Sequence, residues 1–340
     1  MDIEFDGYIY TVDFSNRIGR GGYGSVYPGH LKDDPEFQII VKHFYYDSAD
    51  PESTYMNWSD EISAVLLLGT DFPRCSPYFV CYIGSTVLQN NNEPVYLIAY
   101  KRAWGDMVSF SDKFRTHINS ETKFIFVQSM LMALIELRKR GLAHRDIKAE
   151  NILVFRDRHE WGFTLADLGA LCSTRESTRL SCNISSENKT TITSLPPVIR
   201  SKSRSHSDDP VLNGYLESGV EDTGYRSEDD MMWADIYAMG CVIYTFLTGE
   251  RICLGILRDA RPIQMEDISF TDQEGYKQTI NGALLSEMLT RMIYSRSYEE
   301  ASSYEDVDIF ESPVFVGGSR VLRTIGRTFQ RAGKYRIQRR

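Results

Sequence analysis

The sequence predicts an α+β fold in which a β-rich first part precedes a mainly helical second part. Residues 8–45 and 78–100 alternate apolar and polar side chains, with glycines or asparagines at the turns, which is typical of strands. Residues 121–140 instead repeat apolar side chains every three or four positions, and Gly141 follows where a helix C-cap is expected. This change of period separates the two parts.

Shorter elements complete the pattern. Residues 58–68 are expected to form a helix within the β-rich part. Two short strands are expected after the long helix, over 151–155 and 162–166. Beyond residue 233 the chain is expected to be helical, starting with a long apolar helix over 233–247.

Composition describes an ordinary globular chain. It has 340 residues, enough for one large domain or two smaller lobes, and its net charge of -9 argues against a general nucleic-acid binder. The acidic N-terminus lacks a signal-peptide core, and the apolar run 239–247 is shorter than the about 20 residues that span a bilayer. The six cysteines form no CxxC pair, so we expect free thiols in a reducing compartment, cytoplasmic and/or nuclear.

A glycine-rich segment, Ile18-Gly-Arg-Gly-Gly-Tyr-Gly-Ser-Val26, is the first candidate for a nucleotide site. Glycines let backbone N–H groups approach phosphate oxygens without obstruction by side chains. Dinucleotide-binding folds use a similar motif, but there a helix follows the glycines directly. Here strand-like residues and Pro28 follow, which favours a hairpin.

Lys42 ends the apolar strand-like run Ile39-Ile-Val and is the second candidate. By itself it is compatible with a solvated strand end. Sixteen residues after Val26, however, it stands where a strand could direct it to phosphates held by the glycines. Its ammonium needs a counter-charge, and Glu61 is preferred over the neighbouring Asp60 because it precedes the apolar stripe of the helix.

The segment His144-Arg-Asp-Ile-Lys-Ala-Glu-Asn151 is the most specific motif. Phosphoryl transfer needs a carboxylate for the hydroxyl proton, a cation near the transferred group and oxygen ligands for Mg²⁺. Asp146, Lys148 and Asn151 supply those three within six residues. The alternative, a charged surface turn, does not explain this combination.

Asp167 is the second candidate metal ligand. It follows a predicted strand in Ala166-Asp-Leu-Gly169, 21 residues after Asp146, and offers the hard oxygen that magnesium prefers. An isolated Asp-Leu-Gly would be an ordinary turn, so this assignment depends on the motif before it.

Together these motifs resemble the eukaryotic-type protein kinase superfamily, in the family's order and over roughly residues 10–316. The resemblance implies a bilobal kinase-like fold, with a β-rich N-lobe over about 10–100, a helical C-lobe over about 104–316, and ATP with Mg²⁺ between them. Lysine at position 148 is similar to the serine/threonine branch. The implied substrate is a protein hydroxyl.

The resemblance also implies further site residues. The implied nucleotide contacts are Ile18, Gly19, Gly21, Gly22, Gly24, Val26, Ile40, Lys42, Ala99, Lys101 and Asp106. Among them, Ala99 aligns with the gatekeeper, which would leave an open pocket behind the adenine, and Ile40 replaces a usual alanine. Asp235 looks like the aspartate that supports the catalytic loop, and Arg296 like the arginine that pairs with the glutamate closing the activation segment.

The activation segment departs from the family. Leu168 replaces the usual phenylalanine, no Ala-Pro-Glu occurs, and Glu217 and Glu228 are both candidates for the closing glutamate. Residues 173–207 carry fifteen Ser or Thr and six basic residues, a composition that favours disorder. The insert is either a phosphorylated control segment or a tolerated insertion.

The C-terminal stretch 317–340 is a basic tail. Its eight Lys/Arg and no acid leave the rest of the chain at -17, against -9 for the whole. Apolar residues at helical spacing between the arginines suit a membrane surface, nucleic acid or an acidic partner, or a nuclear-localisation tract. The alternative is a tail that docks onto the chain's own acidic body or stays solvated.

Three functions follow from these observations. The first is an active serine/threonine kinase, because all six chemical positions are filled: Lys42, Glu61, Asp146, Lys148, Asn151 and Asp167. The second is a pseudokinase that binds partners without turnover, suggested by the irregular activation segment. The third is a small-molecule kinase, which the helix carrying Asp235 disfavours. The compact N-terminus and irregular motifs would suit a kinase of a large DNA virus, acting in the host cell.

Overall fold

The computed structural model describes residues 1–72, 75–91, 93–114, 118–157, 160–173, 228–250 and 262–310. The chain divides into two compact units, which we describe separately. The β-rich unit holds Met1–Trp104 and Ala166–Gly169, and the helical unit holds Gly105–Leu165 and the described residues from Ala170 onward. The expected α+β class, with a β-rich first part and a helical second part, is confirmed.

The β-rich unit is built on one antiparallel sheet in the order β1-β2-β4-β5-β7-β6, with β3 paired to β4. The strands are β1 Asp2–Phe5, β2 Tyr8–Val12, β3 Gly19–Arg20, β4 Gly24–Leu31, β5 Asp34–Phe44, β6 Tyr82–Asn90 and β7 Glu93–Lys101. The sheet therefore begins before the expected residue 8.

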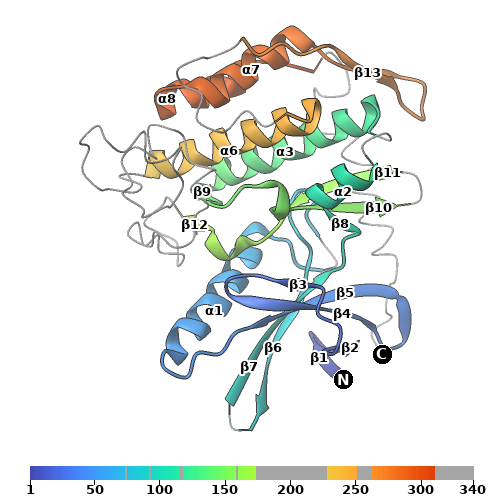
Figure 1. Ribbon diagram of the computed structural model, residues 1–340, viewed down its shortest axis with the longest axis vertical. Coiled ribbons are helices and arrows are strands. Elements are labelled where there is room, and N and C mark those ends of the chain that lie inside the picture. The colour runs from blue at the N-terminus through green and yellow to red at the C-terminus, as the bar shows by residue number, and fades with distance from the viewer. Residues whose placement is uncertain are drawn as a thin grey trace. The chain divides into compact units, whose positions relative to one another are not determined.

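Helix α1 (Pro51–Leu68) lies beside this sheet in Figure 1. It begins before the expected residue 58 because Asp50 caps its N-terminus, accepting a hydrogen bond from the Ser53 N–H, and Pro51 suits the first turn. It ends at Gly69, whose left-handed backbone (φ 64°) favours glycine.

The register of β5 on β7 assigns each side chain to a face. Val41 pairs with Ala99, and both belong to a hydrophobic core cluster that includes Phe5. Lys42 pairs with Ile98, one position along both strands. Because side chains alternate between faces, Lys42 projects from the face opposite that core.

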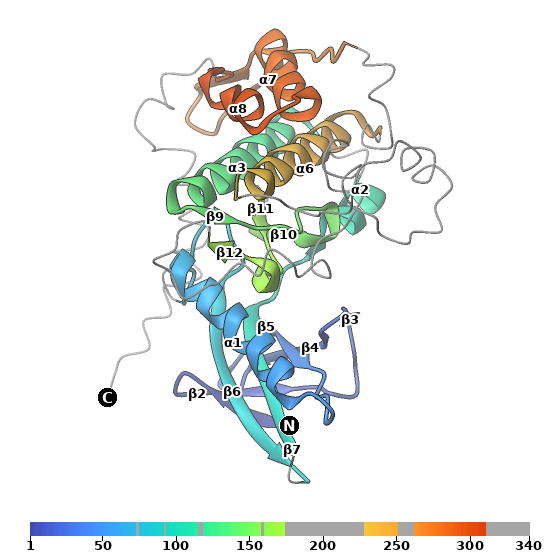
Figure 2. The same ribbon diagram turned by 90° about the vertical axis from the view of Figure 1, so that its left-hand side faces the viewer.

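In the helical unit, α3 (Ser120–Arg140) and α6 (Glu228–Thr248) lie side by side in Figures 1 and 2. Around them are α2 (Met107–Phe114), α7 (Gly282–Tyr294) and α8 (Tyr298–Ser302), with the 3₁₀ turn η6 (Ser303–Asp306). Asn119 caps the start of α3, and Gly141 ends it with φ 64°, as expected.

Among the described residues, only α6 is long and apolar enough to cross a membrane by length and composition. Of its most apolar window, 72% is buried inside the helical unit. A core helix of a folded domain passes the same test, so α6 carries no argument for a membrane span.

Short strands complete the helical unit. β10 (Ile152–Asp157) pairs with β11 (Glu160–Leu165) and with β8 (Gly105–Asp106), and the first two match the expected strand pair. β9 (Leu142–Ala143) pairs with β12 (Cys172–Ser173). The hairpin of β13 (Ile268–Thr271) and β14 (Lys277–Ile280) lies where only helix was expected.

The cysteines differ from expectation. Cys75 and Cys81 form a disulfide, and no cysteine within the described ranges is a free thiol. The six-residue spacing resembles no metal or redox motif, so no sequence pattern predicts that the two cysteines pair. The prediction of free thiols was therefore wrong, and it no longer supports a reducing compartment.

Several predictions fall outside the described residues. These are the serine- and threonine-rich insert beyond Ser173, the candidate glutamate Glu217 and the basic tail 317–340. Glu228 begins α6, but its side chain is not among those described. The domain limits 10–316 therefore stay a prediction.

Aromatic side chains form the centre of the helical unit. Phe126 is fully buried, stacks on Phe246 with ring centroids 3.9 Å apart, and meets Phe163 edge-on at 5.0 Å. These rings join α3, α6 and β11, so the β10–β11 pair that follows residues 144–151 packs against them.

We expect Phe126→Ala to lower the free energy of unfolding by about 3–5 kcal/mol, because it leaves a cavity among close-packed rings. Urea unfolding followed by circular dichroism measures the loss. Tyr276→Ala is the control, since Tyr276 is 48% exposed and should change little. A loss below about 1 kcal/mol for Phe126→Ala would contradict this packing.

Candidate active site

The β-rich unit brings four polar side chains together: Lys42, Glu61, Tyr100 and Asp167, called here the lysine cluster. The Lys42 ammonium donates to Glu61 Oε2 at 2.7 Å and to Asp167 Oδ1 at 3.2 Å. The Tyr100 hydroxyl donates to the second oxygen, Glu61 Oε1, at 2.6 Å. The residue paired with Lys42 is therefore Glu61.

Burial makes these interactions stronger than a surface ion pair. Glu61 is only 2% exposed, whereas Asp167 is 46% exposed. Burial alone would lower the pKa of Lys42, but the neighbouring Glu61 and Asp167 carboxylates raise it above its ordinary value. Burial, together with Glu61, raises the pKa of Tyr100 well above its ordinary value, so its hydroxyl stays a donor.

The turn that carries Asp167 approaches Glu61 closely. A Cβ at Gly169 would lie 3.0 Å from Glu61 Oε2, which explains glycine at this position. Asp167 itself has φ 59°, a left-handed backbone that is uncommon for a residue with a side chain. The segment is thus shaped around the carboxylate of Glu61.

The glycine-rich segment forms the hairpin of β3 and β4, as its sequence favoured. Gly19 pairs with Val26, the Ile18 N–H donates to the Val26 carbonyl at 2.9 Å, and the Gly21 N–H donates to Gly24 at 2.8 Å. Strand, not helix, follows the glycines, which excludes the dinucleotide-binding arrangement. Gly22 lies exposed at the hairpin tip.

Gly24 is fixed by a close approach of backbone. A Cβ there would collide with the carbonyl oxygen of His43 on β5, so only glycine fits. Val26 pairs directly with Lys42, which places the lysine on the strand next to the hairpin.

Ala99 does not line this face of the sheet, and its assignment as gatekeeper needs correction. Ala99 pairs with Val41 and is buried in the core on the opposite face. Tyr100 pairs with Ile40, on the face of Lys42, and reaches Glu61. The alignment was one residue out of register, and one residue in a strand exchanges the two faces. The expected open pocket behind the adenine is therefore not supported.

The remaining predicted nucleotide contacts lie as follows. Ile40 is half-buried on the Lys42 face. Lys101 ends β7, and its backbone N–H donates to Cys81 O at 2.9 Å. Asp106 belongs to the helical unit, where its Oδ1 accepts a hydrogen bond from the Ser109 N–H at 2.7 Å and caps α2.

The helical unit holds the second cluster, called here the catalytic-loop cluster: Asp146, Lys148 and Asn151. The Lys148 ammonium donates to Asp146 Oδ2 at 2.7 Å. The Asn151 side-chain N–H donates to the same oxygen at 2.9 Å and to the Asp146 carbonyl at 2.8 Å. The structure therefore brings the three predicted residues together on one carboxylate.

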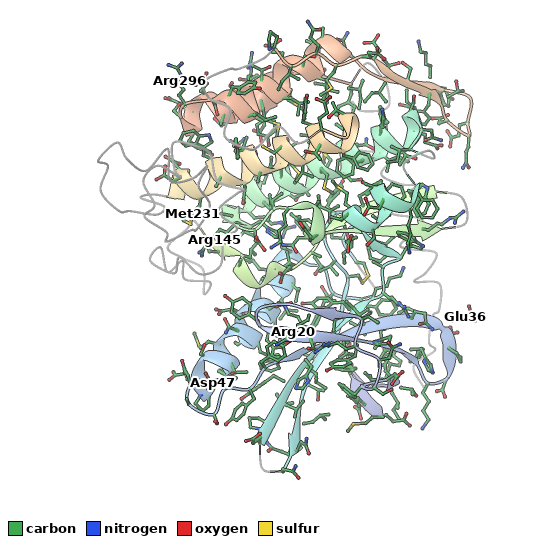
Figure 3. All side chains as sticks on the ribbon, in the orientation of Figure 1. Arg20, Glu36, Asp47, Arg145, Met231 and Arg296 are labelled. Carbon is green, nitrogen blue, oxygen red and sulfur yellow. A yellow bond between two sulfur atoms is a disulfide. The ribbon has the colours of Figure 1, made fainter. Side chains whose placement is uncertain are left out.

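Asp235, on α6, supports this loop. Its carboxylate accepts the backbone N–H of His144 at 2.5 Å and of Arg145 at 2.8 Å. Burial raises the pKa of Asp235 to about 7, although both hydrogen bonds and the Arg145 charge lower it. Arg145, labelled in Figure 3, has φ 70°, so the two hydrogen bonds hold a strained turn.

Arg296, also labelled in Figure 3, lies between α7 and α8. Its backbone N–H donates to Glu300 Oε2 at 2.7 Å. Its pairing with a glutamate that closes the activation segment stays a prediction, because Glu217 lies outside the described residues.

Asp167 and Asn151 each carry a side-chain oxygen of the type that magnesium prefers. Asp167 presents a half-exposed carboxylate, and Asn151 uses its N–H group toward Asp146, which leaves its amide oxygen as the ligand type that Mg²⁺ prefers. In the part of the chain that the structure describes, no three His, Cys, Asp or Glu side chains gather as a ready metal site.

Sequence reasoning missed Tyr100 and Gly169. The motif alignment places Ala99, not Tyr100, beside the nucleotide because it takes no account of strand alternation. Counting faces from Ile40 and Lys42 across the sheet would have found it. The contact of Gly169 with Glu61 has no signal in the sequence.

Comparison of the sequence with known protein families matches the protein kinase domain over residues 12–209, more than half of the chain. This chain therefore belongs to the protein kinase family.

Individual relatives agree at low identity. A probable LRR receptor-like serine/threonine-protein kinase of Arabidopsis thaliana is 25% identical over 71% of this chain and 22% of its own length. A probable serine/threonine-protein kinase of Dictyostelium discoideum is 25% identical over 48% of the chain and 40% of its own. Serine/threonine-protein kinase ULK3 of Mus musculus is 29% identical over 44% of this chain and 28% of its own length. The chain thus matches less than half the length of each, and these relatives do not support a viral origin.

We expect Ala99→Phe to destabilise the protein by about 1–3 kcal/mol, because the larger ring overpacks the sheet core. Urea unfolding measures the change. Val87→Phe on β6 is the matched control, since Val87 is 41% exposed and has room for the ring. If Ala99→Phe were as stable as the control, Ala99 would face an open pocket and the one-residue correction would fail.

Proposed function

We propose that this protein is an active serine/threonine protein kinase, which transfers the γ-phosphate of ATP to protein hydroxyls. The observation that carries the proposal is the catalytic-loop cluster. Asp146 receives one lysine and one asparagine donor on a single oxygen, Oδ2, and these two hydrogen bonds fix the orientation of its carboxylate. That arrangement suits a positioned general base.

In this proposal, the lysine cluster orients the nucleotide. Lys42 contacts the phosphates of ATP, and the buried Glu61 holds Lys42 in place. The backbone of the β3–β4 hairpin covers the phosphates. Asp167 and Asn151 are the proposed ligands of Mg²⁺, which neutralises phosphate charge when bound.

Asp146 then accepts the proton of the substrate hydroxyl as that oxygen bonds to the γ-phosphorus and the bond to the ADP oxygen breaks. Lys148 lies beside Asp146 and offsets negative charge on the transferred group. Lysine at this position and relatives named as serine/threonine kinases support the serine/threonine class.

Two other functions are disfavoured. A pseudokinase has no need for six filled chemical positions or for the hydrogen bonds that orient Asp146. A small-molecule kinase is disfavoured by Asp235, which supports the loop from α6 as the resemblance to protein kinases implies.

Binding of the basic tail to an acidic partner, nucleic acid or a membrane stays part of the proposal.

We expect Asp146→Asn to lower phosphorylation of a generic basic protein by about 10²–10⁴-fold while Mg·ATP affinity changes little, because only the proton acceptor is lost. Labelled ATP measures transfer, and a separate titration measures binding. Asp112→Asn, on the exposed side of α2, is the control and should behave as the unmodified protein. Unmodified protein that binds Mg·ATP without transfer would indicate a pseudokinase, and label on small metabolites alone would indicate a small-molecule kinase.

A further inference from the structure

Tyr100 contacts the buried end of the lysine cluster but has no assigned role. Its hydroxyl donates to Glu61 Oε1 at 2.6 Å, while Lys42 donates to Glu61 Oε2 at 2.7 Å. The two oxygens of one carboxylate therefore have different partners, one neutral and one charged. A carboxylate held at both oxygens keeps one orientation, whereas one held at a single oxygen can rotate.

Glutamate needs this restraint because its side chain has three rotatable bonds. Glu61 is 2% exposed, so water does not substitute for a lost partner at low cost. Tyrosine suits the task, because a ring with two rotatable bonds projects its hydroxyl with little loss of conformational freedom. Tyr100 is itself only 5% exposed.

A competing partner makes the orientation of Glu61 matter. Lys42 also donates to Asp167 at 3.2 Å, and Asp167 is largely accessible. If the Glu61 carboxylate rotated away, the Lys42 ammonium would move toward the carboxylate of Asp167, which is also a proposed metal ligand. Holding Glu61 therefore determines which of two carboxylates positions Lys42.

Strand register delivers the hydroxyl to this point. Tyr100 pairs with Ile40, two residues from Lys42 on the same face of β5. Across the sheet, Tyr82 pairs with Tyr100 and packs edge-on against its ring at 6.3 Å. The Tyr82 hydroxyl donates to Ser85 instead, so the neighbouring tyrosine supports the ring but does not reach Glu61.

We propose that Tyr100 is a positioning residue for the kinase reaction: its hydroxyl fixes the Glu61 carboxylate so that Glu61, and not Asp167, orients Lys42 toward the phosphates of ATP. This inference rests on the proposed function. In this proposal Tyr100 affects the binding of Mg·ATP through Glu61 and does not affect the binding of the protein substrate.

The test compares Tyr100→Phe, which removes only the hydroxyl, with the matched control Tyr82→Phe in the full chain. We expect Tyr100→Phe to weaken Mg·ATP binding and raise KM for ATP by about tenfold, which corresponds to about 1.4 kcal/mol. KM for the protein substrate should stay unchanged. Tyr82→Phe should stay within about twofold for both substrates.

The same substitution in a Glu61→Gln background separates positioning from general stability. There, Tyr100→Phe should change ATP affinity by less than about twofold, because the group it acts through is already altered. Equal effects in both backgrounds would overturn the proposal, as would an unchanged KM for ATP in Tyr100→Phe. A lower Tm with equal changes in both KM values would show a structural role only and would also overturn it.

Mg·ATP binding and phosphate transfer are measured separately, so a failure of the proposed function can be told apart from a failure of the inference about Tyr100. If the unmodified protein binds Mg·ATP but transfers no phosphate, the proposed function fails while the affinities of the Tyr100→Phe and Tyr82→Phe variants still decide the inference. If the unmodified protein does not bind Mg·ATP, both fail.

Discussion

The buried carboxylate of Glu61 is the constraint on which the lysine cluster of the β-rich unit depends. A charge that is 2% exposed persists only when it is paired and hydrogen-bonded, and here Lys42 and Tyr100 supply one partner to each oxygen. Meeting that requirement fixes several elements at once. It sets the register of β5 on β7, the rotation of α1 and the identity of Gly169.

The helical unit solves a comparable problem with Asp235. This carboxylate is also buried, but its two partners are backbone N–H groups of the loop and not side chains. The first carboxylate thus positions the ammonium of a long side chain, whereas the second shapes a turn whose φ of 70° at Arg145 would otherwise be unfavourable. Each unit therefore presents a reactive group whose position depends on a buried acid.

The sequence predicted the two-part architecture, the catalytic-loop cluster and three members of the lysine cluster, Lys42, Glu61 and Asp167, because these residues lie in motifs of regular spacing. Asp146, Lys148 and Asn151 come within six residues, so local geometry brings them together. The assignment of Ala99 as gatekeeper was wrong because a motif alignment can be shifted by one residue without an obvious mismatch. In a strand, the same shift moves the side chain to the other face of the sheet. The Cys75–Cys81 pair and the β13–β14 hairpin depend on tertiary packing that local patterns do not encode.

Gly169 couples two segments that are far apart in the chain. With no side chain of its own, it lets the turn of Asp167 pass within contact distance of Glu61 Oε2, where a Cβ would lie 3.0 Å away. A displacement of α1 that moved Glu61 would remove the surface against which this turn packs, and a change in the turn would disturb the carboxylate. The positions of the helix and the turn are therefore linked through this one contact.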